Sequence, residues 1–208
     1  LIMFRSHLEN GGSLAYDEEI RNPGKGFMNR LTLDTFPRLA AAWTRPYQSA
    51  YYAMYSSVWD AVTTDPRLMT VPIDDHLVHR GDGVFEAFKC VNGRIYNLAA
   101  HLRRLAESAA SIRLALPVDE AALTARIVDT VRAGGRRDAT VRVFVSRGPG
   151  GFSVSPAQCP APQLYIVAGA LGRPFMEGHP AGASVRSSRI PVKPAPFASI
   201  KSCNYMPN

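Results

Sequence analysis

Residues 84–98 read VFEAFKCVNGRIYNL, and this segment carries the clearest structural signal in the chain. Two runs, Val84–Val91 and Arg94–Leu98, are rich in β-branched and aromatic residues, and Asn92-Gly93 lies between them. An Asn-Gly pair between such runs favours a two-residue hairpin turn, because both turn positions need a positive φ angle. The segment therefore predicts two antiparallel strands.

Two helices are predicted after this hairpin. The first runs from about Ala99 to Leu114, because apolar side chains recur at helical spacing and form one face. That face consists of Leu98, Leu102, Leu105, Ala109 and Ile112. The second helix runs from the capping residue Asp119 to Arg132, and Gly134-Gly135 ends it.

Further strands are predicted on both sides of this region. Tyr51–Val62 is apolar and aromatic and predicts one strand before the hairpin. Thr140–Arg147 and Gln163–Gly169 predict strands after the helices, and in the first of them valines alternate with other residues. Ser184–Ile190 and Phe197–Lys201 are predicted as strands near the C-terminus. The order of elements indicates a mixed α and β (α+β) fold, not a regular βαβ series.

Composition divides the chain into four parts. Residues 1–50 are interrupted by glycine and proline and are interpreted as an N-terminal arm, in which 34–43 predicts a short helix. Residues 51–168 are expected to form a small α/β domain. Residues 169–182 contain four glycines and two prolines, which is typical of an interdomain linker. Residues 183–208 are expected to begin a second, β-rich domain.

Charge and cysteine content narrow the functional classes. The net charge is +7, but acidic residues are interspersed among the basic ones, and no basic run carries interleaved aromatic residues. No run approaches the roughly 18 apolar residues that cross a membrane. Cys90, Cys159 and Cys203 match no zinc-binding spacing, and such a sparse, odd set suits a reducing cytosol. We therefore expect a cytoplasmic protein without a metal site, which binds neither nucleic acid nor membranes.

Lysine is scarce in this chain. It has twenty arginines but only four lysines, at positions Lys25, Lys89, Lys193 and Lys201. Arginine stays charged and forms no stable imine with an aldehyde cofactor, whereas a lysine amine can. If the protein uses lysine-based covalent chemistry, few residues can carry it. The apolar approach Phe197–Ile200 indicates that Lys201 is partly buried.

Four segments occur in an order that matches a known family. They are HRGDGVFE at 79–86, HLRRLAESA at 101–109, TVRVFVSRG at 140–148 and IKSCNYMPN at 200–208. Together they resemble the motifs of fold-type IV pyridoxal-phosphate-dependent enzymes, the family of the branched-chain and D-amino-acid aminotransferases. The resemblance covers about Tyr51 to Asn208, and it implies pyridoxal 5'-phosphate as the cofactor.

The resemblance also implies roles for single residues. Lys201 would form the Schiff base with the cofactor, and its displaced amine would then serve as general base. Arg104 would bind the cofactor phosphate, since a guanidinium fork suits that anion. Tyr205 would donate a hydrogen bond to the phenolate oxygen of the cofactor, and Phe85 would face the substrate.

The partner of the substrate carboxylate is left open by the motifs. Bacterial D-amino-acid aminotransferases and the related aminodeoxychorismate lyases have an arginine in the loop where this chain has Phe152, and the former have a histidine where it has Val154. That carboxylate-binding pair therefore cannot be transferred to this chain. Arg142, Arg147 and Arg80 are the local alternatives.

The resemblance implies a homodimeric transaminase that exchanges an amino group between an amino acid, branched-chain or D, and a 2-oxo acid. One alternative is an aminodeoxychorismate-lyase-like carbon–carbon lyase, and another is a non-catalytic protein on the same scaffold. The chain ends seven residues after Lys201. We therefore expect an N-terminal fragment, inactive as residues 1–208 alone, because in relatives the later part supplies the carboxylate that pairs with the pyridine nitrogen of the cofactor.

Overall fold

The computed structural model describes residues 31–187, 189 and 193–204. The chain divides into two compact units, Leu1–Trp43 and Thr44–Asn208. In its described part, the first unit forms the helix α2 (Phe36–Ala42), which confirms the short helix predicted over 34–43. The boundary between the units thus precedes position 50, where the predicted arm ends.

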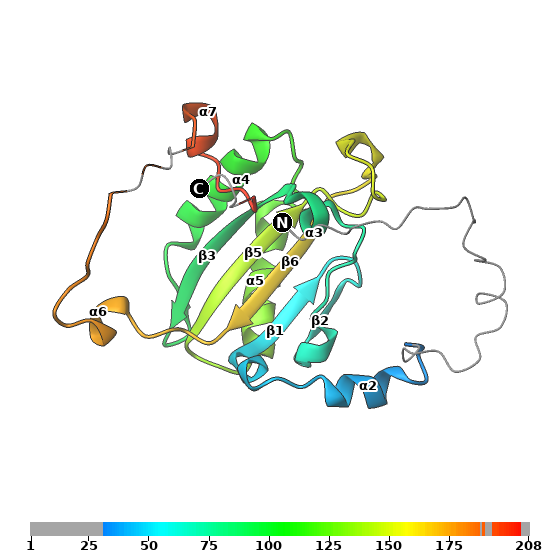
Figure 1. Ribbon diagram of the computed structural model, residues 1–208, viewed down its shortest axis with the longest axis horizontal. Coiled ribbons are helices and arrows are strands. Elements are labelled where there is room, and N and C mark those ends of the chain that lie inside the picture. The colour runs from blue at the N-terminus through cyan, green and yellow to red at the C-terminus, as the bar shows by residue number, and fades with distance from the viewer. Residues whose placement is uncertain (1–30, 188, 190–192, 205–208) are drawn as a thin grey trace, which may run out of the picture. The chain divides into compact units, whose positions relative to one another are not determined.

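A six-stranded antiparallel sheet forms the centre of the described part of the second unit (Figure 1). The strands lie in the order β2-β1-β6-β5-β3-β4. Their bounds are β1 Tyr51–Ser56, β2 Ala61–Thr63, β3 Gly83–Val91, β4 Arg94–Ile95, β5 Ala139–Ser146 and β6 Gln163–Gly169. The structure therefore confirms the strands predicted over 140–147 and 163–169, to within one residue at each end.

The predicted hairpin is confirmed at its turn. Asn92 and Gly93 have φ angles of 52° and 76°, as the two-residue turn requires. The single strand predicted over Tyr51–Val62 is wrong, because the chain reverses within it and β1 pairs with β2. Asp60 takes a φ of 43° in that reversal, a conformation that sequence periodicity does not reveal.

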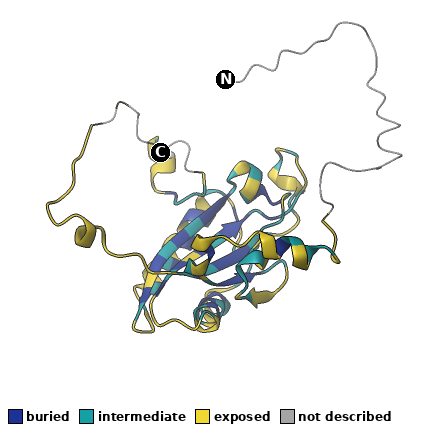
Figure 2. Ribbon diagram, turned by 60° about the horizontal axis from the view of Figure 1, so that its bottom comes forward, coloured by how far each residue is buried: buried dark blue, intermediate teal, exposed yellow. Residues whose placement is uncertain are grey.

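Two long helices cover one face of the sheet (Figure 1). They are α4 (Leu98–Ser111) and α5 (Glu120–Ala133), close to the predicted bounds. The side chain of Asp119 caps α5 by accepting a hydrogen bond of 2.7 Å from the Ala122 N–H. The apolar face of α4 packs on the strands, and buried residues follow this interface (Figure 2).

Several shorter elements complete the described part of the chain. The helix α3 (His76–Arg80) precedes β3, while α6 (Phe175–Gly178) and α7 (Ala195–Ala198) follow β6. Three 3₁₀ turns are Pro46–Ala50, Pro66–Leu68 and Pro156–Gln158. In the predicted linker 169–182, Gly169 still belongs to β6, and α6 is the one regular element after it. That linker stays a prediction.

The C-terminal strand predictions are wrong where they can be checked. Residues 184–187 and 189 form no strand, while 188 and 190 lie outside the described residues. Phe197–Lys201 begins inside α7, because Pro at the first helical turn suits a short helix. After α7 the chain follows the start of β3, where Ser202 forms a bridge with Val84.

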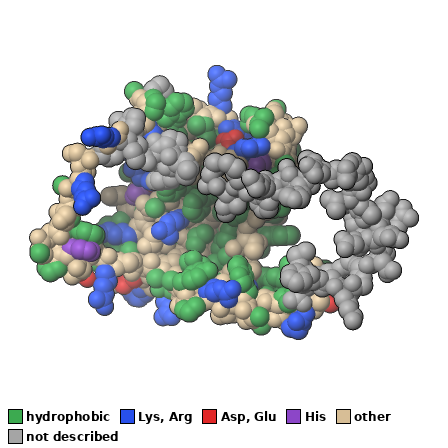
Figure 3. Space-filling view, viewed as in Figure 1, with side chains coloured by type: hydrophobic (Ala, Val, Ile, Leu, Met, Phe, Trp, Pro, Cys, Tyr) green, Lys and Arg blue, Asp and Glu red, His purple; other side chains and the backbone are tan. Residues whose placement is uncertain are grey.

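The second face of the sheet carries side chains from alternate positions of the strands. The register pairs Phe85 with Phe144, and Ala87 with Arg142. On the next strand, Phe144 pairs with Tyr165. Figure 1 shows this face toward the viewer, and Figure 3 shows apolar side chains gathered over it. We call this second face of the sheet, which carries Phe85, Arg142 and Phe144, the open face.

Candidate active site

Lys201 is fixed through its backbone at the edge of the sheet. Its carbonyl oxygen accepts a hydrogen bond of 3.0 Å from the Phe85 N–H. Its own N–H donates to Ser108 Oγ on α4 at 3.2 Å. Ile200, the preceding residue, is buried in the core. The partial burial predicted for Lys201 is confirmed, since it is half-buried.

The side chain of Lys201 lies over an aromatic ring. Its Nζ atom is 4.2 Å from the centroid of the Phe85 ring, which places a cation over the face of the ring. Phe85 in turn stacks on Phe144 at 5.8 Å between ring centroids. The amine is thus positioned at the start of the open face.

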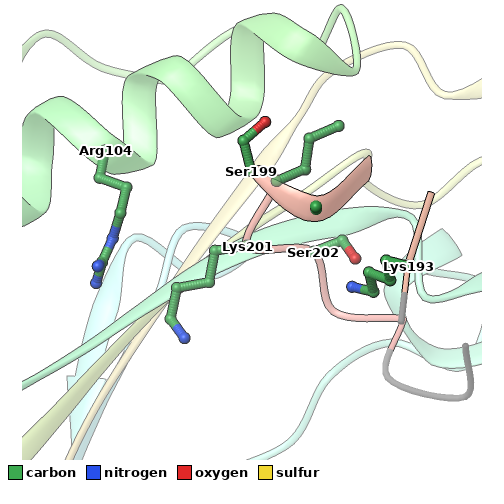
Figure 4. Close-up of a pocket in the computed structure, with 7 residues that line it drawn as sticks. Arg104, Lys193, Ser199, Lys201 and Ser202 are labelled. Carbon is green, nitrogen blue, oxygen red and sulfur yellow. The ribbon is translucent and has the colours of Figure 1, made fainter. Parts of the chain in front are cut away.

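A pocket of about 380 Å³ contains this amine. It is lined by Arg104, Lys193 and the segment 198–202. Figure 4 shows the side chains of Arg104, from α4, and Lys201, from the C-terminal segment, pointing the same way into it. Three cationic side chains and no acidic one line the pocket, so it suits an anionic ligand.

Arg104 is also part of a charge cluster around the buried carboxylate of Glu86. Its Nε atom donates to Glu86 Oε1 at 2.5 Å, and its Nη2 atom donates to Glu86 Oε2 at 2.6 Å. His101 Nδ1 lies 2.8 Å from the same Oε2 atom. Burial alone would raise the pKa of Glu86, but the bonds to Arg104 and His101 hold it below its ordinary value. Glu86 is therefore ionised at neutral pH.

Glu86 is not among the site residues predicted from the sequence. The strand sequence does hold a signal for a buried charge. Glu86 is the one polar residue on a strand face whose other members are Val84, Phe88 and Cys90. On α4, the spacing of three between His101 and Arg104 puts both on one side of the helix.

The arginines predicted near the substrate are not brought together. Arg142 is exposed on the open face and lines a second, mostly apolar pocket of about 350 Å³ with Phe144. No described residue forms an ion pair with Arg142. Arg80 donates to the Phe152 carbonyl oxygen at 3.0 Å.

Arg147 has its donors engaged within the fold. It contacts Asp82 through Nε at 3.1 Å and Nη2 at 3.0 Å. Its guanidinium also donates to the carbonyl oxygens of Ile112 and Arg113. Tyr205, the predicted ligand of the cofactor oxygen, lies outside the described residues. The structure therefore groups Lys201, Phe85 and Arg104, with Arg142 farther along the same sheet.

Comparison with protein families matches this region. The sequence pattern of the family described as amino-transferase class IV matches residues 83–208, which include Glu86, Arg104 and Lys201. The chain belongs to the class IV aminotransferase family. The match begins at β3 and continues through the lysine segment, so it spans every element that builds the pocket.

A relative within this family is the chloroplastic D-amino-acid transaminase of Arabidopsis thaliana. It is 44% identical over 158 residues, which are 76% of this chain and 42% of that protein. The chain therefore spans less than half the length of that relative.

Solved structures of aminotransferases and lyases share the fold. The branched-chain amino acid aminotransferase of Escherichia coli matches with a TM-score of 0.52 and 21% identity, over 59% of this chain and 40% of that chain. The 4-amino-4-deoxychorismate lyase of Pseudomonas aeruginosa matches with a TM-score of 0.54 and 23% identity, over 65% and 49%. These likenesses confirm the mixed α and β fold-type IV architecture.

The described residues show neither a metal-binding cluster nor a membrane-spanning helix. No group of three or more His, Cys, Asp or Glu side chains is placed to hold a metal ion in this part of the chain. None of its helices combines the length and apolar character needed to cross a bilayer.

Proposed function

We propose that the protein is a pyridoxal-phosphate-dependent transaminase that exchanges an amino group between an amino acid and a 2-oxo acid. The observation that carries this proposal is the shared pocket of Lys201 and Arg104. Family membership supports it, because the matched region contains both residues.

The residues of the pocket fit the chemical groups of this cofactor. Arg104 keeps the N–H groups of Nη1 for a phosphate, since Glu86 engages Nε and Nη2. Lys193 adds a second positive charge to the same lining. The volume of about 380 Å³ lies within the range of small-molecule sites, roughly 300–1,000 Å³. When bound, the cofactor would supply an aldehyde that captures amino groups and a ring that accepts electrons.

Lys201 is the residue that we propose to bond covalently to the cofactor. Its backbone is anchored to β3 and α4, so the flexible part of the residue is the side chain that reaches the pocket. Once released from the cofactor, its Nζ atom can hold and return the proton that moves during the exchange. Tyr205 is proposed to donate to the phenolate oxygen of the cofactor.

Arg142 is the arginine that we propose to bind the substrate carboxylate. It lies on the same face as Phe85, beside apolar side chains of the second pocket. An apolar pocket beside a guanidinium that no described residue pairs with suits an amino acid with an apolar side chain. The D-amino-acid transaminase relative supports D-amino acids as the alternative substrate class. Arg80 and Arg147 remain weaker candidates, because both are bonded within the fold.

A panel of half-reactions tests the function. The purified full-length protein, loaded with pyridoxal phosphate, is mixed with single D- and L-amino acids while the visible absorbance is followed. We expect one stereochemical series with apolar side chains to bleach the band and to release the matching 2-oxo acid. Turnover of aminodeoxychorismate, with pyruvate as product and no amino-acid response, would establish the lyase instead.

We further propose that the protein is a homodimer in the cytoplasm. The aromatic stretch Tyr47–Tyr55 supports a subunit contact, since Tyr47 and Tyr51 are both exposed. The three cysteines are free, which fits a reducing compartment. Light scattering at micromolar concentration checks the homodimer, and a fully active monomer would contradict it. Fluorescence microscopy of the tagged protein checks the cytoplasmic location, and concentration of the protein in an organelle would contradict it.

A further inference from the structure

Glu86 has a fully buried side chain, 0% exposed, in the middle of β3. The other residues on this side of the strand, Val84, Phe88 and Cys90, are apolar. Burial of a carboxylate in such surroundings is costly unless it is paired and hydrogen-bonded. Its partners come from α4, and each of them reaches down to the strand.

The partners use both carboxylate oxygens of Glu86. Arg104 engages them as a two-pronged fork, at 2.5 and 2.6 Å. His101 Nδ1 adds a contact of 2.8 Å. A bidentate guanidinium–carboxylate pair fixes the orientation of both planes, which a single bond does not.

The fork holds a side chain that also lines the ligand pocket. The side chain is 50% exposed and lines the pocket that contains Lys201. An exposed arginine without the fork has considerable rotamer freedom. A ligand that binds it must immobilise the side chain, and this entropy cost lowers the affinity. With the fork, Nε and Nη2 are already held, and Nη1 can still donate to an anion.

We propose that Glu86 is a positioning residue for anion binding, which clamps Arg104 so that its Nη1 edge is presented to the phosphate of the cofactor. This inference rests on the proposed function. A carboxylate that only neutralised Arg104 would have the opposite effect, because its removal would strengthen the binding of an anion. The direction of the effect therefore separates the two roles.

Two variants of the full-length protein test the role. Glu86→Gln removes the charge and one acceptor oxygen. Glu86→Asp keeps the charge, but it is one methylene shorter and cannot span the same two donors. Glu107→Gln is the matched control, since it removes an exposed carboxylate from the same helix. Each protein is titrated at equilibrium with pyridoxal phosphate and, separately, with pyridoxal, which lacks the phosphate.

We expect both Glu86 variants to bind pyridoxal phosphate about tenfold more weakly, the scale of one hydrogen bond to a charged group. Their affinity for pyridoxal should stay near that of the wild type, which also shows that the pocket is folded. Equal or tighter binding of pyridoxal phosphate by Glu86→Gln would overturn the inference, as would wild-type affinity of Glu86→Asp or an equal loss for both ligands. A wild type that binds neither ligand would overturn the proposed function itself.

Discussion

Lys201 has its backbone held independently of its side chain, by Phe85 and Ser108. Removal of the side chain should therefore leave the pocket in place. We expect Lys201→Ala to bind pyridoxal phosphate only non-covalently and to lose the absorbance band of the lysine adduct. Mass spectrometry after borohydride reduction checks this on wild type and variant. An adduct on Lys193, which lines the same pocket, would contradict the assignment.

Arg104 contributes donors to the proposed phosphate site from a fixed position. Arg104→Ala should weaken the binding of pyridoxal phosphate by about 1.5–3 kcal/mol, the scale of a hydrogen bond to a charged group. The same change leaves Glu86 buried with one partner fewer, so the thermal midpoint should also fall. Arg103→Ala, in the exposed neighbour, is the control for both measurements. Unchanged affinity of Arg104→Ala in an equilibrium titration would falsify the role.

The sequence predicts single site residues only where a motif names them. Lys201 and Arg104 were found through the resemblance, and the structure shows that they share a pocket. Glu86 was missed, because its role depends on which residues of α4 lie over the middle of β3. The ion pair of Arg147 with Asp82 cannot be predicted from local sequence, since 65 positions separate the two residues along the chain.

Among the elements, α3 is tied to the sheet by one buried carboxylate. Asp75 caps α3 by accepting from the Leu77 N–H at 2.8 Å, and it accepts from Tyr165 Oη on β6 at 2.6 Å. Ser146 Oγ on β5 donates to it as well. We expect Asp75→Asn to reduce the free energy of unfolding by about 1.5–3 kcal/mol, because an amide cannot accept all three bonds.

Thermal and urea unfolding of the variant check this expectation. Tyr165→Phe removes one donor and keeps the carboxylate, so its effect should be smaller. Asp74→Asn is the neighbouring control. An Asp75→Asn protein as stable as the control would show that the bonds to this carboxylate do not hold α3 to the sheet.

Elements with strong local periodicity were predicted well. The helices α4 and α5, the strands β5 and β6 and the Asn92-Gly93 turn all follow from nearby residues. The β1–β2 reversal was missed, because Ser57–Asp60 contains no glycine or proline to mark it. The segment at Lys201 was predicted as a strand, yet its path depends on β3, which lies more than a hundred positions earlier.

At the scale of the whole molecule, burial holds several ionisable groups in their neutral form. It raises the pKa of the thiols of Cys90 and Cys159 and of the phenol of Tyr165. It raises the pKa of Cys203, two residues after Lys201, to about 12. Because the folded pKa lies above the unfolded one, these groups favour the folded state most at low and neutral pH.

Because the pKa of these groups is higher in the folded state, the stability of the fold is expected to fall at alkaline pH. The contribution of Cys203 is fully present below the ordinary thiol pKa, about 8.5, and is lost as the pH rises toward 12. The unfolding midpoint of the full-length protein should therefore fall steadily above pH 8.5. Cys203→Ala should show a shallower fall over the same range, because an alanine cannot ionise. Ser202→Ala should keep the wild-type slope, since it changes the neighbouring residue and leaves the thiol in place. If the Cys203→Ala and wild-type curves run parallel up to pH 11, ionisation of this thiol does not limit the alkaline stability of the fold.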